Sequence, residues 1–132
     1  VEEAAAGAAN IEYAGWVTRK GVKSVIDGSD VLILPSVEEA FGTIALEAMA
    51  RRRLVLVSAS CGILNWPDLA AGVEAIGPGE SLAGAISRIS RMEPFRRREK
   101  AALAGEAAQA FNRRTLGEWT ALFQEIANRY EG

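Results

Sequence analysis

One stretch of the sequence decides the fold: VLILPSVEEAFGTIALEAMA, residues 31–50. Its first four residues form a continuous apolar run that ends at a proline, which is typical of a strand covered on both faces of a parallel sheet. Residues 43–50 would be apolar or small on nearly every face of a helix, which predicts a helix that is buried all round. The stretch therefore predicts a unit of strand, loop and helix.

Two carboxylates, Glu39 and Glu47, straddle the start of this helix. Glu47 is the only ionisable group in residues 43–50, and a glutamate is almost never fully buried without a partner. Because an unpaired buried charge is costly or raises the pKa of the group, we expect another group to meet Glu47. Two plainer interpretations stay open. Glu47 could form an ion pair with Arg51, four residues later, and Glu39 could be a solvated loop acid beside Glu38.

The helix would begin beyond the carboxyl end of the strand, where ligands bind in doubly wound sheets. A helix N-terminus there offers unpaired N–H groups and a partial positive charge. Gly42 would let the backbone approach a ligand closely, and Thr43 is the expected N-cap. Anion-binding amides beside two hydroxyl-accepting carboxylates suit a molecule with phosphates and sugar hydroxyls, such as a nucleotide sugar.

Three segments carry a resemblance to a known family: Leu34-Pro35-Ser36, Glu39-Ala-Phe-Gly42 and Leu46-Glu47-Ala-Met-Ala50. Together they resemble the E-x7-E signature of the retaining GT-B glycosyltransferases, especially glycosyltransferase family 4. The resemblance extends upstream through Asn10-Ile-Glu-Tyr-Ala-Gly15-Trp16-Val17 and downstream through Leu54-Val-Leu-Val-Ser58. It therefore covers most of the chain.

The resemblance implies roles for eight residues. Glu39 would bind hydroxyls of the donor sugar and is the candidate catalytic residue, through positioning, while Glu47 would accept the ribose hydroxyls. No metal or other cofactor is expected, because the diphosphate leaves without a metal in family members. Main-chain groups would make the remaining contacts. The sugar and diphosphate would be contacted by the backbone of Phe41, Gly42, Thr43 and Ile44, and the base by the backbone around Trp16 and Val17.

The implied fold is α/β, a partial doubly wound, Rossmann-like parallel sheet with C-terminal helices, in which residues 1–132 form a single incomplete nucleotide-sugar-binding domain. Family domains begin with a strand-helix-strand segment that carries a Gly-rich turn and basic diphosphate ligands, and this chain starts after it. The family sheet order, 3-2-1-4-5-6, would then leave two strands missing. We therefore expect a fragment or a split arrangement that lacks the N-terminal acceptor domain and transfers no sugar alone. Its open sheet edges would pair with another chain or with each other.

Two segments depart from the family pattern. Arg51-Arg52-Arg53-Leu54 stands where relatives end the signature helix with a small residue, glycine, any residue and proline, so the usual glycine C-cap is missing. Cys61-Gly62-Ile63-Leu64-Asn65 keeps one glycine of the family's Gly-Gly-x-Pro-Glu. We expect these departures to affect acceptor selection and activity, and to leave the donor signature intact.

Composition excludes several classes of function. The 132 residues suggest one domain, and a net charge of −2 offers no basic field for nucleic acid. Histidine is absent, which excludes Ser-His-Asp and Cys-His catalysis and His-containing zinc sites within this chain. The single cysteine, Cys61, fits a reducing cytoplasm. Arginines 51–53 and 96–98 are expected on solvated faces. The alternative is that either cluster contacts an acidic lipid surface, which would make the full-length protein membrane-peripheral.

The remaining pattern predicts alternating elements and a helical C-terminus that packs across the sheet. Residues 115–118 form a capping-box pattern that would start the last helix, whose apolar stripe runs from Leu116 to Tyr130. The predicted strands are residues 11–14, 31–34, 54–58 and 73–76. The predicted helices are residues 2–9, 22–27, 43–50, a turn at 65–68, 81–90, 94–111 and 115–130.

Two other classes of protein stay open. A non-catalytic nucleotide-sugar-binding or interaction module would keep Glu39 and Glu47 but lack an acceptor domain. A receiver-like signalling domain would need an acidic residue at a strand's carboxyl end, where Leu34-Pro35-Ser36 offers none.

Overall fold

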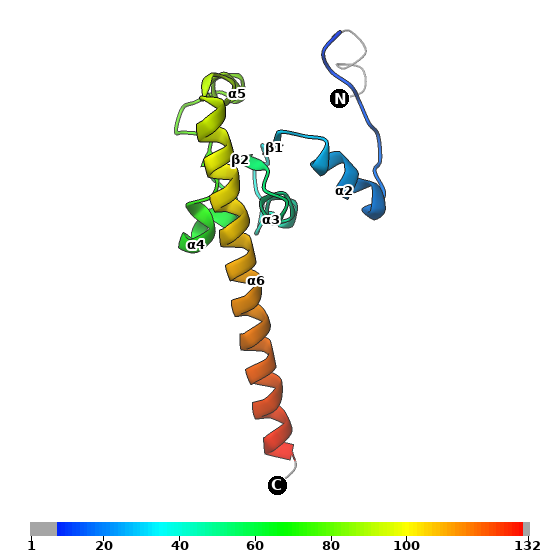
Figure 1. Ribbon diagram of the computed structural model, residues 1–132, viewed down its shortest axis with the longest axis vertical. Helices are drawn as coiled ribbons and strands as arrows, with labels where there is room; N and C mark the ends of the chain where they lie inside the picture. Colours follow the sequence, from blue (N-terminus) through cyan, green and yellow to red (C-terminus); the bar gives the residue numbers. More distant parts are fainter. Residues whose placement is uncertain (1–7, 131–132) are drawn as a thin grey trace.

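The computed structural model (Figure 1) describes residues 8–130. It contains a parallel sheet in the order β1-β2-β3. β1 spans Val31–Leu34, β2 spans Leu54–Val57 and β3 spans Glu74–Ala75. The β1–β2 register begins with Val31 beside Leu54 and ends with Leu34 beside Val57. The expected α/β fold with a parallel sheet is therefore confirmed. The carboxyl ends of the strands lie at one edge of the sheet.

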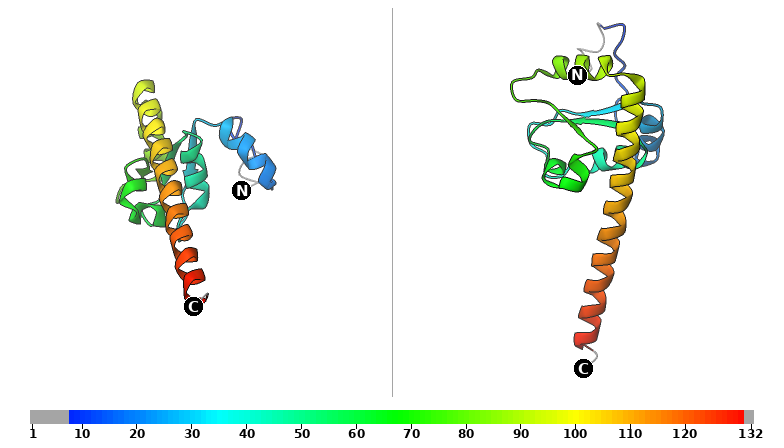
Figure 2. Two further views of the ribbon diagram at one scale, coloured as in Figure 1. Left: turned by 60° about the horizontal axis from the view of Figure 1, so that its bottom comes forward. Right: turned by 60° about the vertical axis from the view of Figure 1, so that its left-hand side comes forward.

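The strand β2 is fully buried, and its alternate residues pack on opposite faces, as strand geometry requires. One face contacts α3 (Thr43–Ala50), α4 (Pro67–Ala70) and α6 (Pro94–Tyr130), and the other contacts α5 (Leu82–Arg91). Figure 2 shows the strands between these two helical layers. Both faces of β1 also reach a hydrophobic cluster, but β1 is only half-buried, because among residues 8–130 it pairs with β2 alone.

The chain before the sheet differs from expectation. The helix α2 (Arg19–Asp27) is confirmed and begins earlier than expected, with the Thr18 side chain accepting a hydrogen bond from the Gly21 amide at 3.3 Å. The expected strand at residues 11–14 is wrong: this segment is not paired and is mostly exposed. A strand needs a neighbour for its backbone hydrogen bonds, and none of the described strands supplies one. The expected helix at residues 2–9 falls mainly outside the described residues, and Ala8 and Ala9 are not helical.

The helix α6 runs unbroken for 37 residues, so the expected division near residues 111–115 is wrong. Thr115 lies inside the helix, and no capping box forms there. The residues between the two expected helices, 112–114, include no proline or glycine, so nothing local breaks the helix. The first half packs on the domain through Ala104, Gly105 and Ala108, whereas the second half extends beyond the sheet (Figure 1). The exposed residues of the second half include Leu116, Trp119, Leu122, Phe123, Ile126 and Tyr130.

The helix α3 ends without the usual glycine. Arg52 takes the left-handed conformation, with φ at 55°, directly after the C-cap Arg51. The Arg53 amide then donates to the Ala48 carbonyl at 2.9 Å, and the Arg52 amide donates to the Met49 carbonyl at 2.8 Å. These two bonds form a complete Schellman motif. The helix therefore ends in the usual way even without a glycine, because Arg52 adopts the backbone conformation that glycine favours.

Replacing Arg52 with glycine is expected to raise the free energy of unfolding by about 0.5–1 kcal/mol, because it removes left-handed strain from a side chain with a Cβ. The loss of the contact between the Arg52 stem and Gly105 limits the gain. Urea unfolding followed by circular dichroism measures it. The matched control is Arg91→Gly at the last residue of α5, where the backbone is helical and glycine should destabilise by about 1 kcal/mol. Equal effects at both positions would contradict the explanation.

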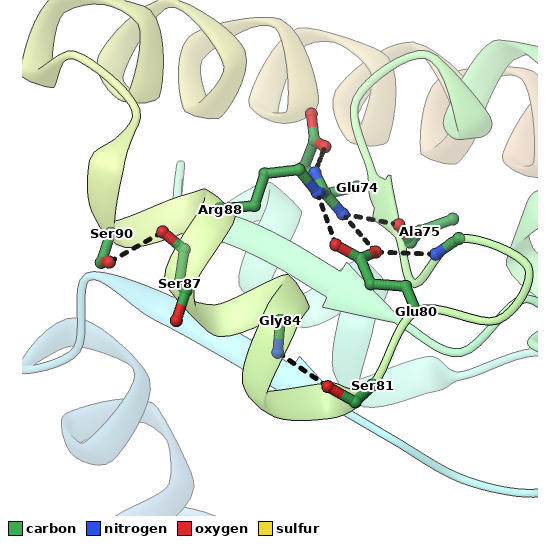
Figure 3. Close-up of polar contacts among 9 residues, drawn as sticks. Glu74, Ala75, Glu80, Ser81, Gly84, Ser87, Arg88 and Ser90 are labelled. Carbon is green, nitrogen blue, oxygen red and sulfur yellow. Dashed lines mark hydrogen bonds and ion pairs between the residues drawn. The ribbon is translucent and has the colours of Figure 1, made fainter.

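One arginine, Arg88 on α5, joins the helix to β3 and to the loop after it (Figure 3). Its guanidinium donates to Glu80 Oε1 at 3.0 Å, to Glu74 Oε2 at 2.6 Å and to the Ala75 carbonyl at 2.9 Å. Lys100 of α6 also forms an ion pair with Glu74. The network therefore holds α5, the β3 edge and the start of α6 together.

Candidate functional site

Glu39 lies in the loop between β1 and α3, and its half-buried carboxylate turns back onto its own loop. Oε1 accepts a hydrogen bond from the Gly42 amide at 3.1 Å and a longer one from the Phe41 amide at 3.5 Å. The interpretation of Glu39 as a merely solvated acid therefore does not describe it. Its carboxylate lies beside the N-terminus of α3, where the helix dipole favours a negative charge.

The loop that carries Glu39 is held by the segment after β2. The Gly62 amide donates to the Glu39 carbonyl at 2.8 Å, and Glu39 and Cys61 form an isolated parallel bridge. The approach at Gly62 is very close, because a Cβ on this residue would lie 1.8 Å from the Ala40 carbonyl oxygen. Gly62 is the one glycine kept from the pattern of the family that the sequence resembles, and its close contact explains why a side chain does not fit there.

The N-terminus of α3 is built by Gly42. Its φ of 88° places it in the left-handed region, and it, not Thr43, is the N-cap, so the expected Thr43 cap is wrong. A Cβ on Gly42 would also lie 2.9 Å from the Cys61 sulfur. Within residues 8–130 the amides of Thr43 and Ile44 have no hydrogen-bond partner, as is usual for the first turn of a helix. They are the two main-chain donors left open at this site.

Glu47 is exposed, so the expectation of a helix buried all round is wrong. The buried residues of α3 are Ala45, Ala48 and Met49, which face the sheet and α6. The opposite side of α3 is not covered by the described residues, and sequence alone could not reveal a missing cover. The ion pair with Arg51, the open alternative for Glu47, is also absent from the described structure. Arg51 instead pairs with Asp27 of α2, and that hydrogen bond holds the pKa of the Asp27 carboxyl below its usual value.

One hollow of about 640 Å³ lies between α3 and α2, and we call it the Trp16 hollow. This volume is in the range of small-ligand sites. It brings together four of the eight expected site residues, Trp16, Val17, Ile44 and Glu47. The Trp16 side chain is 95% exposed and so is free to contact a ligand. The residues that complete the lining are Arg19, Val22, Lys23, Ala50 and Arg51.

Sequence reasoning missed the cations of this hollow. Arg19 and Lys23 lie four residues apart on α2, and Arg51 follows α3. The four-residue spacing of Arg19 and Lys23 places them on one face of a helix, and this spacing was the sequence signal that could have indicated a cationic face. The sequence could not show that this face meets Glu47, because α2 and α3 are separated by a strand and a loop. The hollow therefore offers both hydroxyl-accepting and anion-binding groups.

Phe41 points its ring away from the Trp16 hollow into an aromatic cluster. The ring centroid lies 6.3 Å from Trp66 and 6.0 Å from Phe111 of α6, and Trp66 and Phe111 lie 5.2 Å apart. Such aromatic pairs stabilise by roughly 0.5–1.5 kcal/mol beyond the area they bury. The cluster anchors the Glu39 loop to α6. The ring of Phe41 therefore serves as a packing anchor, and its amide donates to Glu39.

Neither a metal-binding cluster nor a membrane-spanning helix occurs in residues 8–130. No group of three or more metal-ligating side chains is clustered in this part of the chain. None of its helices is both long and apolar enough to cross a membrane.

The fold and the site define a class: α/β domains that gather ligand-binding groups beyond the carboxyl ends of a parallel sheet. Residues 2–108 match the family described as "Glycosyl transferases group 1", and the chain belongs to that family. A curated relative is described as an uncharacterized glycosyltransferase of Methanocaldococcus jannaschii. It is 39% identical over 55 residues, which are 42% of this chain and 14% of the relative. The match thus spans about one seventh of that relative's length.

Proposed function

We propose that this chain is the donor-binding part of a retaining GT-B glycosyltransferase that transfers a sugar from a nucleotide-diphosphate sugar to an acceptor. One observation carries the proposal: Glu47 lies in the same hollow as Trp16 and Val17, one helical turn from the open amides at the start of α3. Membership of the glycosyltransferase family supports it.

In this proposal the donor lies across the N-terminus of α3. Glu47 accepts hydrogen bonds from the ribose hydroxyls, and the backbone near Trp16 and Val17 contacts the base. The open amides of Thr43 and Ile44 face the phosphates, where the helix dipole adds a favourable field. Arg19 and Lys23 line the same hollow and would balance the negative charge of the diphosphate.

The proposed chemistry is electrostatic, with hydrogen-bond donors directed at the charge that develops on the departing diphosphate. Glu39 would bind sugar hydroxyls through its second oxygen, Oε2, because Oε1 is held by the Gly42 amide. The Gly42 bond fixes the carboxylate, so Glu39 acts as a positioning residue. No metal takes part in this proposal. The acceptor would bind to a further domain of a longer protein, and the isolated 132-residue chain would transfer no sugar.

Replacing Glu47 with glutamine is expected to weaken binding of a nucleoside diphosphate by roughly 1–3 kcal/mol, about 5- to 150-fold in Kd, because it disturbs a charged hydrogen bond. Titration calorimetry with UDP, GDP and ADP would identify the base and measure the change. The control is Glu99→Gln, an exposed glutamate of α6 that makes none of the site contacts. Unchanged affinity in the Glu47 variant would refute the ribose assignment, and binding of none of the three nucleotides would refute the donor site in this chain.

A second candidate, a nucleotide-sugar-binding module without catalysis, is favoured by the hydrogen bonds between Glu39 and its own loop. Both candidates bind a nucleotide sugar, so sugar transfer measured on the longer protein separates them, and the variant Glu39→Gln tests the contact with the sugar. If Glu39 binds the sugar, the variant should weaken binding of a nucleotide sugar by about 1 kcal/mol more than binding of the matching nucleoside diphosphate, because only the sugar reaches Glu39. If Glu39 is purely structural, both ligands should lose affinity equally, as measured by the same calorimetry.

A further inference from the structure

The two arginine triplets, residues 51–53 and 96–98, lie more than forty positions apart in the sequence, and the fold brings members of both to one place. A hollow of about 280 Å³ is lined by Arg52 and Arg53 from the loop after α3, and by Arg97 and Arg98 from the start of α6. We call it the arginine hollow. The remaining lining residues are Asp30, Leu54, Pro94 and Ala101.

This hollow lies at the opposite end of the sheet from the donor site. Asp30 and Arg53 immediately precede Val31 and Leu54, which pair at the amino ends of β1 and β2. Glu39 and the start of α3 instead follow the carboxyl end of β1. The arginine hollow is therefore distinct from the Trp16 hollow and independent of the proposed function.

The charge of the hollow is strongly positive, in a chain whose net charge is −2. Four arginines and one aspartate among its lining residues give a formal charge of +3. Within residues 8–130 none of the four guanidinium groups forms an ion pair with a carboxylate. Four like charges around one small hollow repel one another, and a bound anion would relieve that repulsion.

Arg53 gives a second, independent indication. Its Nη2 donates to the Asp27 carbonyl at 2.7 Å, which fixes the side chain. Its Nε is shielded from solvent and has no hydrogen-bond partner among the described residues. A buried N–H without an acceptor is costly, and negative charge bound beside it would reduce that cost. The start of α6, at Pro94, adds the partial positive charge of a long helix to the same place.

We propose that the arginine hollow binds a phosphate-type anion, as a phosphomonoester or a diphosphate group. Planar guanidinium groups match phosphate oxygens in pairs, and an arginine is always charged, so four of them favour phosphate over a singly charged anion. The phosphate could belong to a soluble compound or to a lipid headgroup. Asp30 weakens the site, because it is the carboxylate among the described lining residues.

The test uses the isotope-labelled 132-residue chain and two probes, inorganic pyrophosphate and vesicles of phosphatidylcholine with or without phosphatidic acid. Pyrophosphate should shift the amide NMR signals of residues 52–54 and 95–101 and the Arg53 Nε–H signal. Arg97→Gln and the more exposed Arg98→Gln should each weaken binding at these signals about five- to tenfold. Asp30→Asn should strengthen it severalfold. Circular dichroism melts establish that each variant is folded.

The matched control is Arg96→Gln, which removes the same charge one residue earlier on α6 but does not line the hollow. Its effect should stay below about twofold. Pyrophosphate binding that depends on Arg97 and Arg98 supports a soluble phosphate, and vesicle binding that needs both phosphatidic acid and these arginines supports a headgroup. An equal loss with Arg96→Gln, or shifts confined to residues 41–47, would overturn the proposal. So would the absence of binding to both probes.

Discussion

Replacing Gly62 with alanine is expected to lower the free energy of unfolding by about 3 kcal/mol or more, at the upper end of the cost of overpacking. The added Cβ would lie 1.8 Å from the Ala40 oxygen and 2.6 Å from the Ala40 carbonyl carbon. Both atoms belong to the backbone, so no side chain can rotate away. The loop itself is held by the Gly62 amide and by the bridge between Glu39 and Cys61.

Urea unfolding of the two proteins measures this loss. The control is Gly117→Ala, inside α6, where an added Cβ meets no atom within 4 Å among the described residues and should stabilise by about 1 kcal/mol. Under the proposed function, the Gly62 variant should also lose affinity for a nucleotide sugar, because relief of the clash displaces Glu39. A Gly62 variant as stable as the unsubstituted chain would show that the loop and η1 (Gly62–Asn65) are not packed as described.

Replacing Arg88 with glutamine is expected to lower the free energy of unfolding by about 2 kcal/mol at pH 7, because it leaves two carboxylates short of a partner. The side chain of Glu74 is only 13% exposed and would keep Lys100 alone. Glu80 would keep the hydrogen bond from the Gly77 amide at 2.9 Å. Arg88 is itself partly exposed, which places the cost below that of a fully buried ion pair.

The pH dependence of this loss identifies its cause. Burial raises the pKa of Glu74, but the hydrogen bonds and charges of Lys100 and Arg88 outweigh it and leave that pKa below the ordinary 4.5. The pKa of Glu80 is also lowered, mainly by its hydrogen bond with Arg88. Carboxylates with depressed pKa values stabilise the fold above the unfolded pKa, and this contribution is lost as the pH falls through the folded pKa.

The difference in stability between the unsubstituted chain and Arg88→Gln should therefore be largest at neutral pH and should shrink below about pH 4.5. Urea unfolding at several pH values tests this. Arg91→Gln, on the same helix, is the control and should change stability by less than about 0.5 kcal/mol, because this exposed arginine forms no ion pair in the described structure. A difference that is the same at pH 3 and pH 7 would assign the loss to packing instead.

Local sequence signals predicted most of the secondary structure. The apolar runs at residues 31–34 and 54–57 are strands, and the three- and four-residue spacing after Ser81 is helix α5. Pro67 opens a short helix, as its fixed φ allows. These features depend on side chains that are neighbours in sequence. For the same reason the expected break in α6 was wrong: a capping-box pattern can occur within a helix when no residue before it stops the helix.

The sequence predicted which residues belong to the candidate site better than it predicted how they are arranged. The resemblance selected eight residues, and four of these line one hollow: Trp16, Val17, Ile44 and Glu47. The exposure of Glu47 could not be predicted, because burial depends on which element covers the outer side of α3. Arg19 and Lys23 were missed because their role in the site depends on how α2 meets α3.

By itself, the sequence determined the order of strands and helices between residues 19 and 91, the α/β class and the spacing of Glu39 and Glu47, since all three follow from neighbouring residues. The tertiary structure decided which groups meet. In the folded chain Gly42 is the N-cap of α3, and the Glu39 carboxylate accepts hydrogen bonds from amides of its own loop. Members of two distant arginine triplets line one hollow. Such contacts depend on how separated segments cross in space, and no local pattern in the chain records that.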